Sequence, residues 1–331
     1  MPEIWSIFRK DPVLLAERKT DRSFFLHLVY AFLSSGIAII SFFALIYSLS
    51  DMLGSIAVFT ETYAQYESSL KSENALFTPG NIYSFLFIGA YGIVLSIIAI
   101  SLISIHKKTF TFGLVYGSPF SWTPFFKTAS ALALIFVLAG TYYLFFPENM
   151  AMRPLSSADL IWFSIALVAL FFQTLGEEMF FRGYLLRVWG AVIPYRIIIV
   201  GSLTALFVSV HTYNPDVQTD FWFFVIIFVI TELLYYWVLF RTRSVMATWG
   251  MHFINNVFAV LVIAVVPGWK NDLAIFTYTD PVLSAGGSYL YDPWAYGMQI
   301  FAISCFILLI CWKRSPFYVF AAKDYSLSNT R

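Results

Sequence analysis

Apolar runs of about 20 residues, separated by short charged segments, are the feature that most restricts how this chain folds. A helix of that length spans the roughly 30 Å hydrocarbon core of a bilayer. About eight such runs are present, and they cover residues 23–50, 81–105, 128–146, 160–186, 197–213, 221–240, 245–266 and 294–312. Only 12% of the residues are charged, whereas a soluble domain carries about 25%. We therefore expect an all-α, polytopic integral membrane protein.

The positions of Lys and Arg predict how these helices are oriented. If the N-terminus is cytoplasmic, all but three of the 20 Lys and Arg residues fall in inner segments. The exceptions are Lys71, Arg153 and Lys270. Because positive charge collects on the inner side, both ends are predicted to be cytoplasmic. We expect an inner segment over 1–22, a single transmembrane domain over 23–312 and an inner tail over 313–331. The first apolar run is too long for a signal-peptide core, so we expect a retained anchor.

Ionisable residues are rare in the middle of the expected spans, and they gather between 160 and 266. They are Glu177, Glu178, His211, Glu232 and His252. A charged side chain at that depth costs about 2.5–3.5 kcal/mol even on lenient insertion scales. These residues are therefore the first candidates for a functional site.

The spacing of these residues predicts which side chains meet. Glu178 and Arg182 are four residues apart, so they share a helix face and can form an ion pair. Glu177 points about 100° away from Glu178, and it needs a partner from another helix or a proton. His252 and Asn256 are also four apart, so together they could donate two hydrogen bonds to one oxygen, as an oxyanion site requires.

Glu232 has two possible arrangements. It could line a cavity and pair with Arg182 or a histidine. It could also be protonated and bonded to a nearby hydroxyl, such as that of Thr231 or Tyr235. We expect the second arrangement.

Three motifs follow one another on successive expected helices: Glu177-Glu178-x-x-x-Arg182, then Phe207-x-x-x-His211, then His252-x-x-x-Asn256. Together they resemble the CAAX prenyl endopeptidase type II family, also called the CAAX protease and bacteriocin-processing family. The extended pattern Glu-Glu-x-x-Phe-Arg-Gly-Tyr-Leu is also present. The resemblance covers about 160–266, which we expect to be the protease core. It implies an intramembrane protease of about eight helices, with a cavity open to the cytosol and lipid.

The resemblance also implies catalytic roles. Glu177 would be the general base, and His211 would help it to activate a water molecule. His252 and Asn256 would form the oxyanion hole. These roles agree with the side chains themselves, because peptide hydrolysis needs a base beside a water molecule and donors for the developing oxyanion.

Other motif residues are expected to support this chemistry. Glu178 and Arg182 would hold the site together, and Phe207 and Glu232 are candidate cavity-lining residues. No serine or cysteine nucleophile stands in a recognisable motif. We expect a membrane-embedded, glutamate-dependent endopeptidase that uses neither a metal nor another cofactor.

Other interpretations stay open. The polar residues could simply link helices by hydrogen bonds of about 0.6 kcal/mol each, which explains their clustering poorly. Two Glu and two His could bind zinc, but His-Glu-x-x-His is absent and Arg182 adds a nearby cation. A non-catalytic family member could act as a membrane scaffold or bacteriocin-immunity protein, and the variant Glu177→Gln separates that function from catalysis. The paired broken helices of a transporter are not evident.

The surroundings of the protein follow from the same features. We expect a peptide or membrane-protein substrate, and the net charge of +1 gives no reason to expect nucleic acid. The bacteriocin-processing resemblance favours a bacterial plasma (inner) membrane, where prenylated CAAX substrates are not expected. The long outer segments 51–80 and 267–293 are expected to be solvated loops.

Overall fold

The computed structural model describes residues 33, 36, 79–105, 108–143, 150–152, 157–193, 195–212, 217, 220–266, 274–279, 288–290 and 293–319. Almost all of the first expected span, 23–50, lies outside these residues. The inner segment 1–22, most of the two long outer segments and the end of the tail lie outside them too. Predictions about those parts therefore stay predictions.

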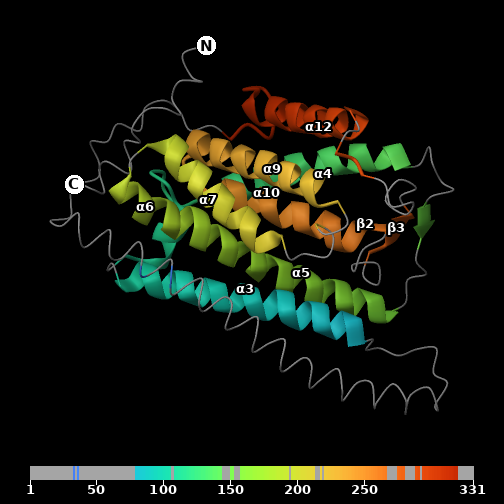
Figure 1. Cartoon of the computed structure of the whole chain (residues 1–331), viewed down its shortest axis with the longest axis horizontal. Helices are drawn as coiled ribbons and strands as arrows, with labels where there is room; N and C mark the ends of the chain where they lie inside the picture. The colour runs from blue at the N-terminus through green and yellow to red at the C-terminus, as the bar shows by residue number, and fades with distance from the viewer. Residues whose placement is uncertain are drawn as a thin grey trace.

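Each expected span from 81–105 onward coincides with a helix or a series of helices (Figure 1). These elements are α3 (Pro79–Ile105), α4 (Thr123–Tyr143), α5 (Ser157–Glu177), η4 (Glu178–Leu185), α6 (Leu186–Val192), α7 (Arg196–His211), α9 (Phe221–Thr242), α10 (Val245–Val257), η5 (Phe258–Val262) and α12 (Pro293–Cys311). A short helix, η2 (Phe110–Leu114), follows α3. The apolar runs thus predicted the described helices to within a few residues at most ends.

Four of these helical stretches are long and apolar enough to cross a membrane, and they cover Thr123–Thr141, Phe163–Gly190, Phe221–Thr242 and Val245–Val262. Shorter apolar helices cover Gly89–Ile105, Arg196–His211 and Ile300–Cys311. The described part of the chain is mostly helical, and its four long apolar helices indicate a multi-pass membrane protein.

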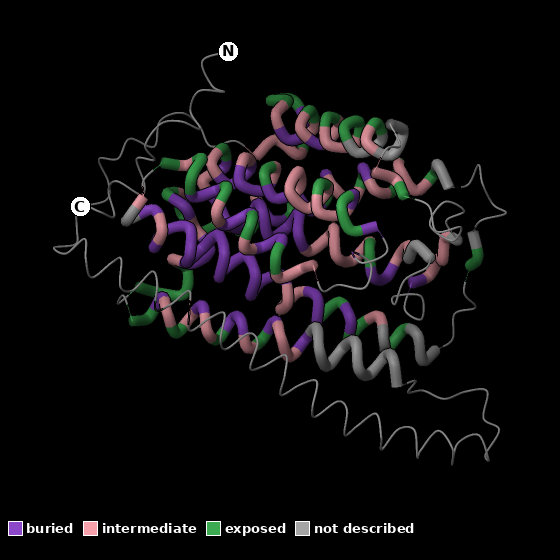
Figure 2. The backbone as a smooth tube through the Cα atoms, in the orientation of Figure 1, coloured by how far each residue is buried: buried purple, intermediate pink, exposed green. Residues whose placement is uncertain are grey.

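The buried residues gather along the middle of the molecule, where α5, η4 and α10 run (Figure 2). The outward surfaces of the helices carry large exposed apolar side chains, including Ile97 on α3, Val168 on α5 and Leu308 on α12. Water would disfavour such a surface, whereas lipid would cover it. The polar motif residues of η4 and α10 therefore lie in the protected centre of the protein.

A small sheet departs from the expected all-α fold. It contains β1 (Met150–Met152), β2 (Ile263–Val266) and β3 (Phe276–Thr279) in the order β1-β3-β2. β1 pairs antiparallel with β3, and β2 pairs parallel with β3. The expected span 245–266 consequently ends as a helix at Val262, and its last four residues form β2. Because Ile, Val and Ala have no charge, hydropathy alone could not separate this strand from the helix before it.

Glycines allow α3 to approach α5 closely. A Cβ atom on Gly92 would collide with the backbone of Phe172 and Gln173. A Cβ atom on Gly176 would lie 2.6 Å from the carbonyl oxygen of Gly92 and 3.1 Å from the backbone nitrogen of Ser96. Small residues permit this kind of close helix packing in membranes. The contact fixes the last turns of α5, which lead directly into Glu177.

The helix that carries the first motif changes from α-helical to π-helical geometry at Glu178 and keeps it to Leu185. Such wider turns are uncommon and occur frequently at functional sites. Within this stretch, a Cβ atom on Gly183 would collide with the carbonyl group of Gly113 in η2. The π-helical segment is thus held against η2, and it presents Arg182 to the interior.

Candidate active site

Glu178 is the centre of a buried polar network. Its Oε1 accepts hydrogen bonds from Arg182 and from Nδ1 of His252, the latter at 2.9 Å. Its Oε2 accepts one from the hydroxyl of Thr248 at 2.6 Å. Since a carboxylate buried in protein is costly unless its oxygens are paired, these three donors account for the presence of Glu178 here. The predicted pair of Glu178 with Arg182 is therefore present in the structure.

Arg182 also pairs with Glu232, which comes from α9. Its guanidinium lies over the rings of Tyr235 and Tyr236, 4.8 and 5.3 Å from their centroids. Oε2 of Glu232 is buried and accepts no hydrogen bond from the described residues. The hydroxyl bond that we expected for Glu232 is therefore wrong, because the long Arg182 side chain reaches α9 and supplies a full opposite charge.

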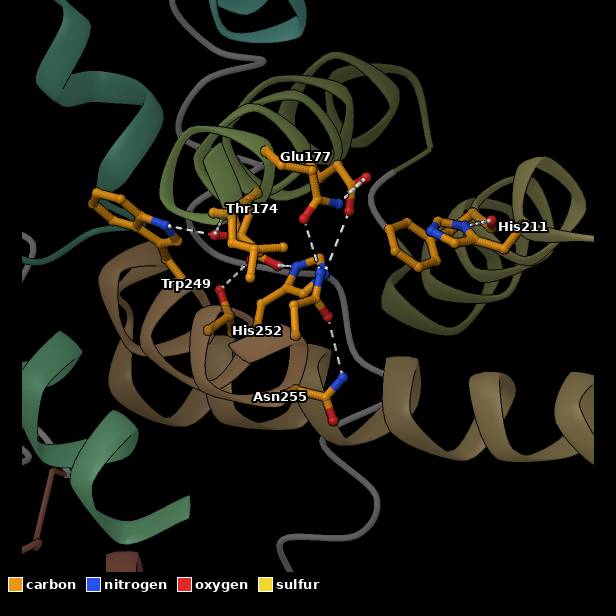
Figure 3. Close-up of polar contacts among 12 residues, drawn as sticks. Thr174, Glu177, His211, Trp249, His252 and Asn255 are labelled. Carbon is orange, nitrogen blue, oxygen red and sulfur yellow. Dashed lines mark hydrogen bonds and ion pairs between the residues drawn. The ribbon is translucent and has the colours of Figure 1, made fainter. Parts of the chain in front are cut away.

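Glu177 faces the other side of the same histidine. Its Oε2 lies 3.4 Å from Nε2 of His252, which is an ion-pair distance slightly longer than a hydrogen bond (Figure 3). Its Oε1 accepts a 2.7 Å hydrogen bond from Nε2 of Gln173, one turn earlier on α5. Oε2 itself is buried and accepts no hydrogen bond from the described side chains. One oxygen of Glu177 is thus held, and the other is directed at an imidazole.

His252 bridges the two glutamates, and its hydrogen bonds fix which nitrogen carries a proton. Nδ1 must donate, because Glu178 already accepts from Arg182 and Thr248. If the ring is neutral, Nε2 then carries only a lone pair and can accept a hydrogen bond. If the ring is an imidazolium, Nε2 carries a proton and can donate one. Its contact with Glu177 is attractive only if a proton lies on one of the two groups. Glu177 therefore faces the Nε2 side of the His252 ring, and Glu178 faces the Nδ1 side.

Two hydrogen bonds link α10, which carries His252, to its neighbouring helices α5 and α4. Trp249 donates a 3.2 Å hydrogen bond to the hydroxyl of Thr174 on α5. On the other side, Thr128 of α4 donates a 2.7 Å hydrogen bond to the carbonyl oxygen of Ala247. These two bonds lie within about two turns of His252, and they link α10 to its two neighbouring helices.

Asn256 is linked to the site by a hydrogen bond to Gln173. Nδ2 of Asn256 donates to Oε1 of Gln173 at 2.8 Å, and Asn255 donates to Oδ1 of Asn256 at 3.3 Å. The side chains of His252 and Asn256 thus lie on the same side of α10, as their spacing predicted. Both face α5, where His252 lies 3.4 Å from Glu177 and Asn256 is linked to Glu177 through Gln173.

His211 takes a different position. Its Nδ1 lies 2.7 Å from the backbone oxygen of Phe207, and its ring stacks on the Phe207 ring at a centroid distance of 4.2 Å. The Phe207 ring in turn lies 6.2 Å from the ring of His252. Figure 3 shows His211 to one side of the Glu177–His252 contact. Phe207 therefore lies between the two histidines, and the water-activating role of His211 stays a prediction.

Tyr91 of α3, which hydrogen-bonds Glu177, and two further residues of this network were not found from the sequence. Gln173 and Thr248 are uncharged, so a search for ionisable groups in apolar spans passed over them. Gln173 stands four residues before Glu177, and Thr248 stands four residues before His252. A search for polar side chains one helical turn from each candidate would have identified both.

The described residues also bear on the zinc hypothesis. Among them, no group of three or more His, Cys, Asp or Glu side chains is arranged to hold a metal ion. Glu178, which would be needed as a third ligand beside Glu177 and His252, is already held by Arg182 and Thr248. The donor set in this part of the chain does not fit the zinc sites of known hydrolases.

Comparison with known proteins agrees with the motifs. Residues 159–258 match the family model described as "Type II CAAX prenyl endopeptidase Rce1-like", which confirms the resemblance. The uncharacterized protein YyaK of Bacillus subtilis (strain 168) is 26% identical over 118 residues. That alignment covers 35% of this chain and 40% of YyaK. No solved structure matches the chain significantly.

Proposed function

Because residues 159–258 form a type II CAAX prenyl endopeptidase Rce1-like domain, we propose that this protein is an intramembrane peptidase whose general base is Glu177. The observation that carries the proposal is the pairing of a buried carboxylate with an imidazole, 3.4 Å apart, with the carboxamide of Asn256 linked to the same carboxylate through Gln173. A carboxylate of this kind can remove a proton from water as the water attacks a peptide carbonyl.

The other side chains have complementary tasks in this proposal. Negative charge develops on the carbonyl oxygen during attack, and Asn256 and His252 donate hydrogen bonds to it. With its Nδ1–H donated to Glu178, His252 offers a proton at Nε2 only as the imidazolium, whose charge Glu178 balances. Arg182 keeps Glu178 charged and in place. His211 reaches the water after a rotation that moves the Phe207 ring aside.

We also propose a membrane topology, a cellular location and a class of substrate for the whole chain. About eight spans with both ends in the cytoplasm agree with the distribution of Lys and Arg. A bacterial inner membrane is the proposed location, and a peptide or membrane-protein segment is the proposed substrate. Such a substrate reaches the centre of the helices from the cytoplasm or the bilayer.

Comparative proteomics of membranes tests this function. Cells that carry the wild-type protein should contain peptide fragments that are absent from cells carrying Glu177→Gln. Asp220→Asn is a matched control, because Asp220 is also a buried carboxylate but binds Ser288 and Tyr289 at the start of α9. That variant should leave the fragments unchanged. Identical fragments in all three strains would refute the peptidase function.

The same strains separate catalysis from scaffolding. If Glu177→Gln keeps the cellular phenotype of the wild type while no fragment changes, the protein acts by binding a partner. If phenotype and fragments are lost together, hydrolysis is its function.

A further inference from the structure

Side-chain amides form a continuous row that ends at the carboxylate of Glu177. Asn255 donates to Asn256, Asn256 donates to Gln173, and Gln173 donates to Glu177, at 3.3, 2.8 and 2.7 Å. We propose that Gln173 is a positioning residue that couples the general base to the oxyanion donor. This inference rests on the proposed peptidase function.

The carboxylate dictates the direction of every bond in the row. An ionised carboxylate only accepts hydrogen bonds, so Gln173 must turn its NH₂ group toward Glu177. The carbonyl oxygen of Gln173 then faces Asn256, which must present its own NH₂ group. The oxygen of Asn256 is left to accept from Asn255. Reversing any one amide would place two oxygens or two NH₂ groups against each other, so the row has a single consistent polarity.

This polarity determines what Asn256 can offer a substrate. Its NH₂ group has two N–H bonds, and Gln173 accepts one of them. The second N–H is thereby held in a fixed direction. Because Asn255 holds the oxygen of Asn256, that oxygen is kept away from the position where a developing oxyanion would be repelled. Gln173 thus positions the Asn256 donor and the Glu177 base relative to each other.

Packing behind Gln173 gives this placement independent support. The backbone of Gln173 lies against α3 at Gly92, where a Cβ atom would overlap it. Gln173 therefore cannot shift toward α3, and its side chain is held on the face of α5 that meets α10. Because it is four residues from Glu177 and bonded to Asn256, it joins these two helices at the site.

The neighbouring residue provides a matched control. Thr174 also links α5 to α10, since its hydroxyl accepts a 3.2 Å hydrogen bond from Trp249. It is buried, and its hydroxyl bonds to Leu170, Phe171 and Trp249 rather than to Glu177 or Asn256. Thr174→Val therefore removes one bond between the same two helices and leaves the amide row intact.

Infrared difference spectroscopy of the purified full-length protein tests the coupling without any substrate. The spectrum of the wild type minus that of Glu177→Gln isolates the bands of the Glu177 carboxylate. Gln173→Met, which has nearly the same length but no N–H group, should shift these bands, and Thr174→Val should not. Gln173→Glu keeps an oxygen for Asn256 and brings two carboxyls together, so a protonated carboxyl band should appear.

Kinetics provide the second measurement. The probe is a fluorogenic peptide that spans the cleavage site identified by the fragment comparison. Gln173→Met should lower kcat by roughly 10- to 100-fold, the effect of losing a hydrogen bond to a charged group, while KM stays within about twofold. Thr174→Val should change neither constant by more than about threefold.

The outcomes are distinct. Unchanged Glu177 bands in both Gln173 variants would overturn the coupling, even if the protein proves to be a peptidase. Equal losses of kcat in Gln173→Met and Thr174→Val would reduce Gln173 to a structural link and also overturn it. Shifted bands in a protein that cleaves nothing would support the coupling and refute the peptidase function, so the two failures are distinguishable.

Discussion

Arg182→Met is the substitution for which the structure predicts the largest loss of stability. Arg182 is fully buried and pairs with two buried carboxylates, Glu178 and Glu232. Methionine fills a similar volume but leaves both charges without their cation. Breaking a buried ion pair by removing one partner costs about 3–5 kcal/mol. The loss should lie in the upper part of that range, because Glu232 has no second donor among the described residues.

A double variant separates lost charge from lost packing. In the double variant Arg182→Met with Glu232→Gln, Glu178 is the only one of these three residues that stays charged. It still accepts hydrogen bonds from Thr248 and His252. This variant should regain roughly 1–3 kcal/mol relative to Arg182→Met alone, as expected for directly coupled residues. Both values are measurable from the free energy of unfolding when the purified protein is titrated with SDS in mixed micelles.

Arg241→Met is the control, because Arg241 is an exposed arginine at the end of α9. It should change the free energy of unfolding by less than about 0.5 kcal/mol. A cost below about 1 kcal/mol for Arg182→Met, or a double variant less stable than the single one, would refute the assignment of Arg182 as the cation of the network.

Further predictions concern packing, the Glu178 environment and metal dependence. Gly183→Ala should destabilise the protein by about 1–3 kcal/mol in the same titration, since its methyl group would collide with Gly113. Gly201→Ala, with nothing within 4 Å of the added carbon, should not. Thr248→Val should lower the free energy of unfolding by about 1.5–3 kcal/mol, because it removes a hydrogen bond to a buried carboxylate. A decrease of less than about 0.5 kcal/mol would contradict this prediction. Peptide cleavage should survive 1,10-phenanthroline, and its complete, zinc-reversible loss would restore the metalloprotease hypothesis.

The helices were predictable because the spans follow a simple physical rule. Lipid requires long uninterrupted apolar helices, so 221–240 and 128–146 could be recognised from hydropathy alone. The pair of Glu178 and Arg182 was predictable for a similar reason, since both residues are on one helix and four apart.

What could not be predicted depends on how helices rotate against each other. The sequence does not say whether Glu177 faces His211 or His252, because each lies on a separate helix. In the structure, Gly92 and Gly176 allow α3 to pack closely against α5, and Glu177 at the end of α5 faces His252. The π-helical stretch after Glu177 changes the rotation again, and no residue type signals it.

Uncharged polar residues were the second source of error. Gln173 carries no charge, and its apolar neighbours conceal it in a window-averaged hydropathy profile, yet it accounts for the link between Glu177 and Asn256. The small sheet was missed because its strands are short: β1 lies between two expected spans, β2 ends an expected span, and β3 lies within the expected loop 267–293.

The most direct test of the central claim uses purified protein in proteoliposomes. Membrane proteins from cells that lack the gene are added, and new N-termini are labelled and identified by mass spectrometry. Wild-type protein should generate a defined set of new N-termini, and Glu177→Gln should generate none of them. The same set from both proteins would contradict the account, because cleavage would then not require the carboxylate of Glu177.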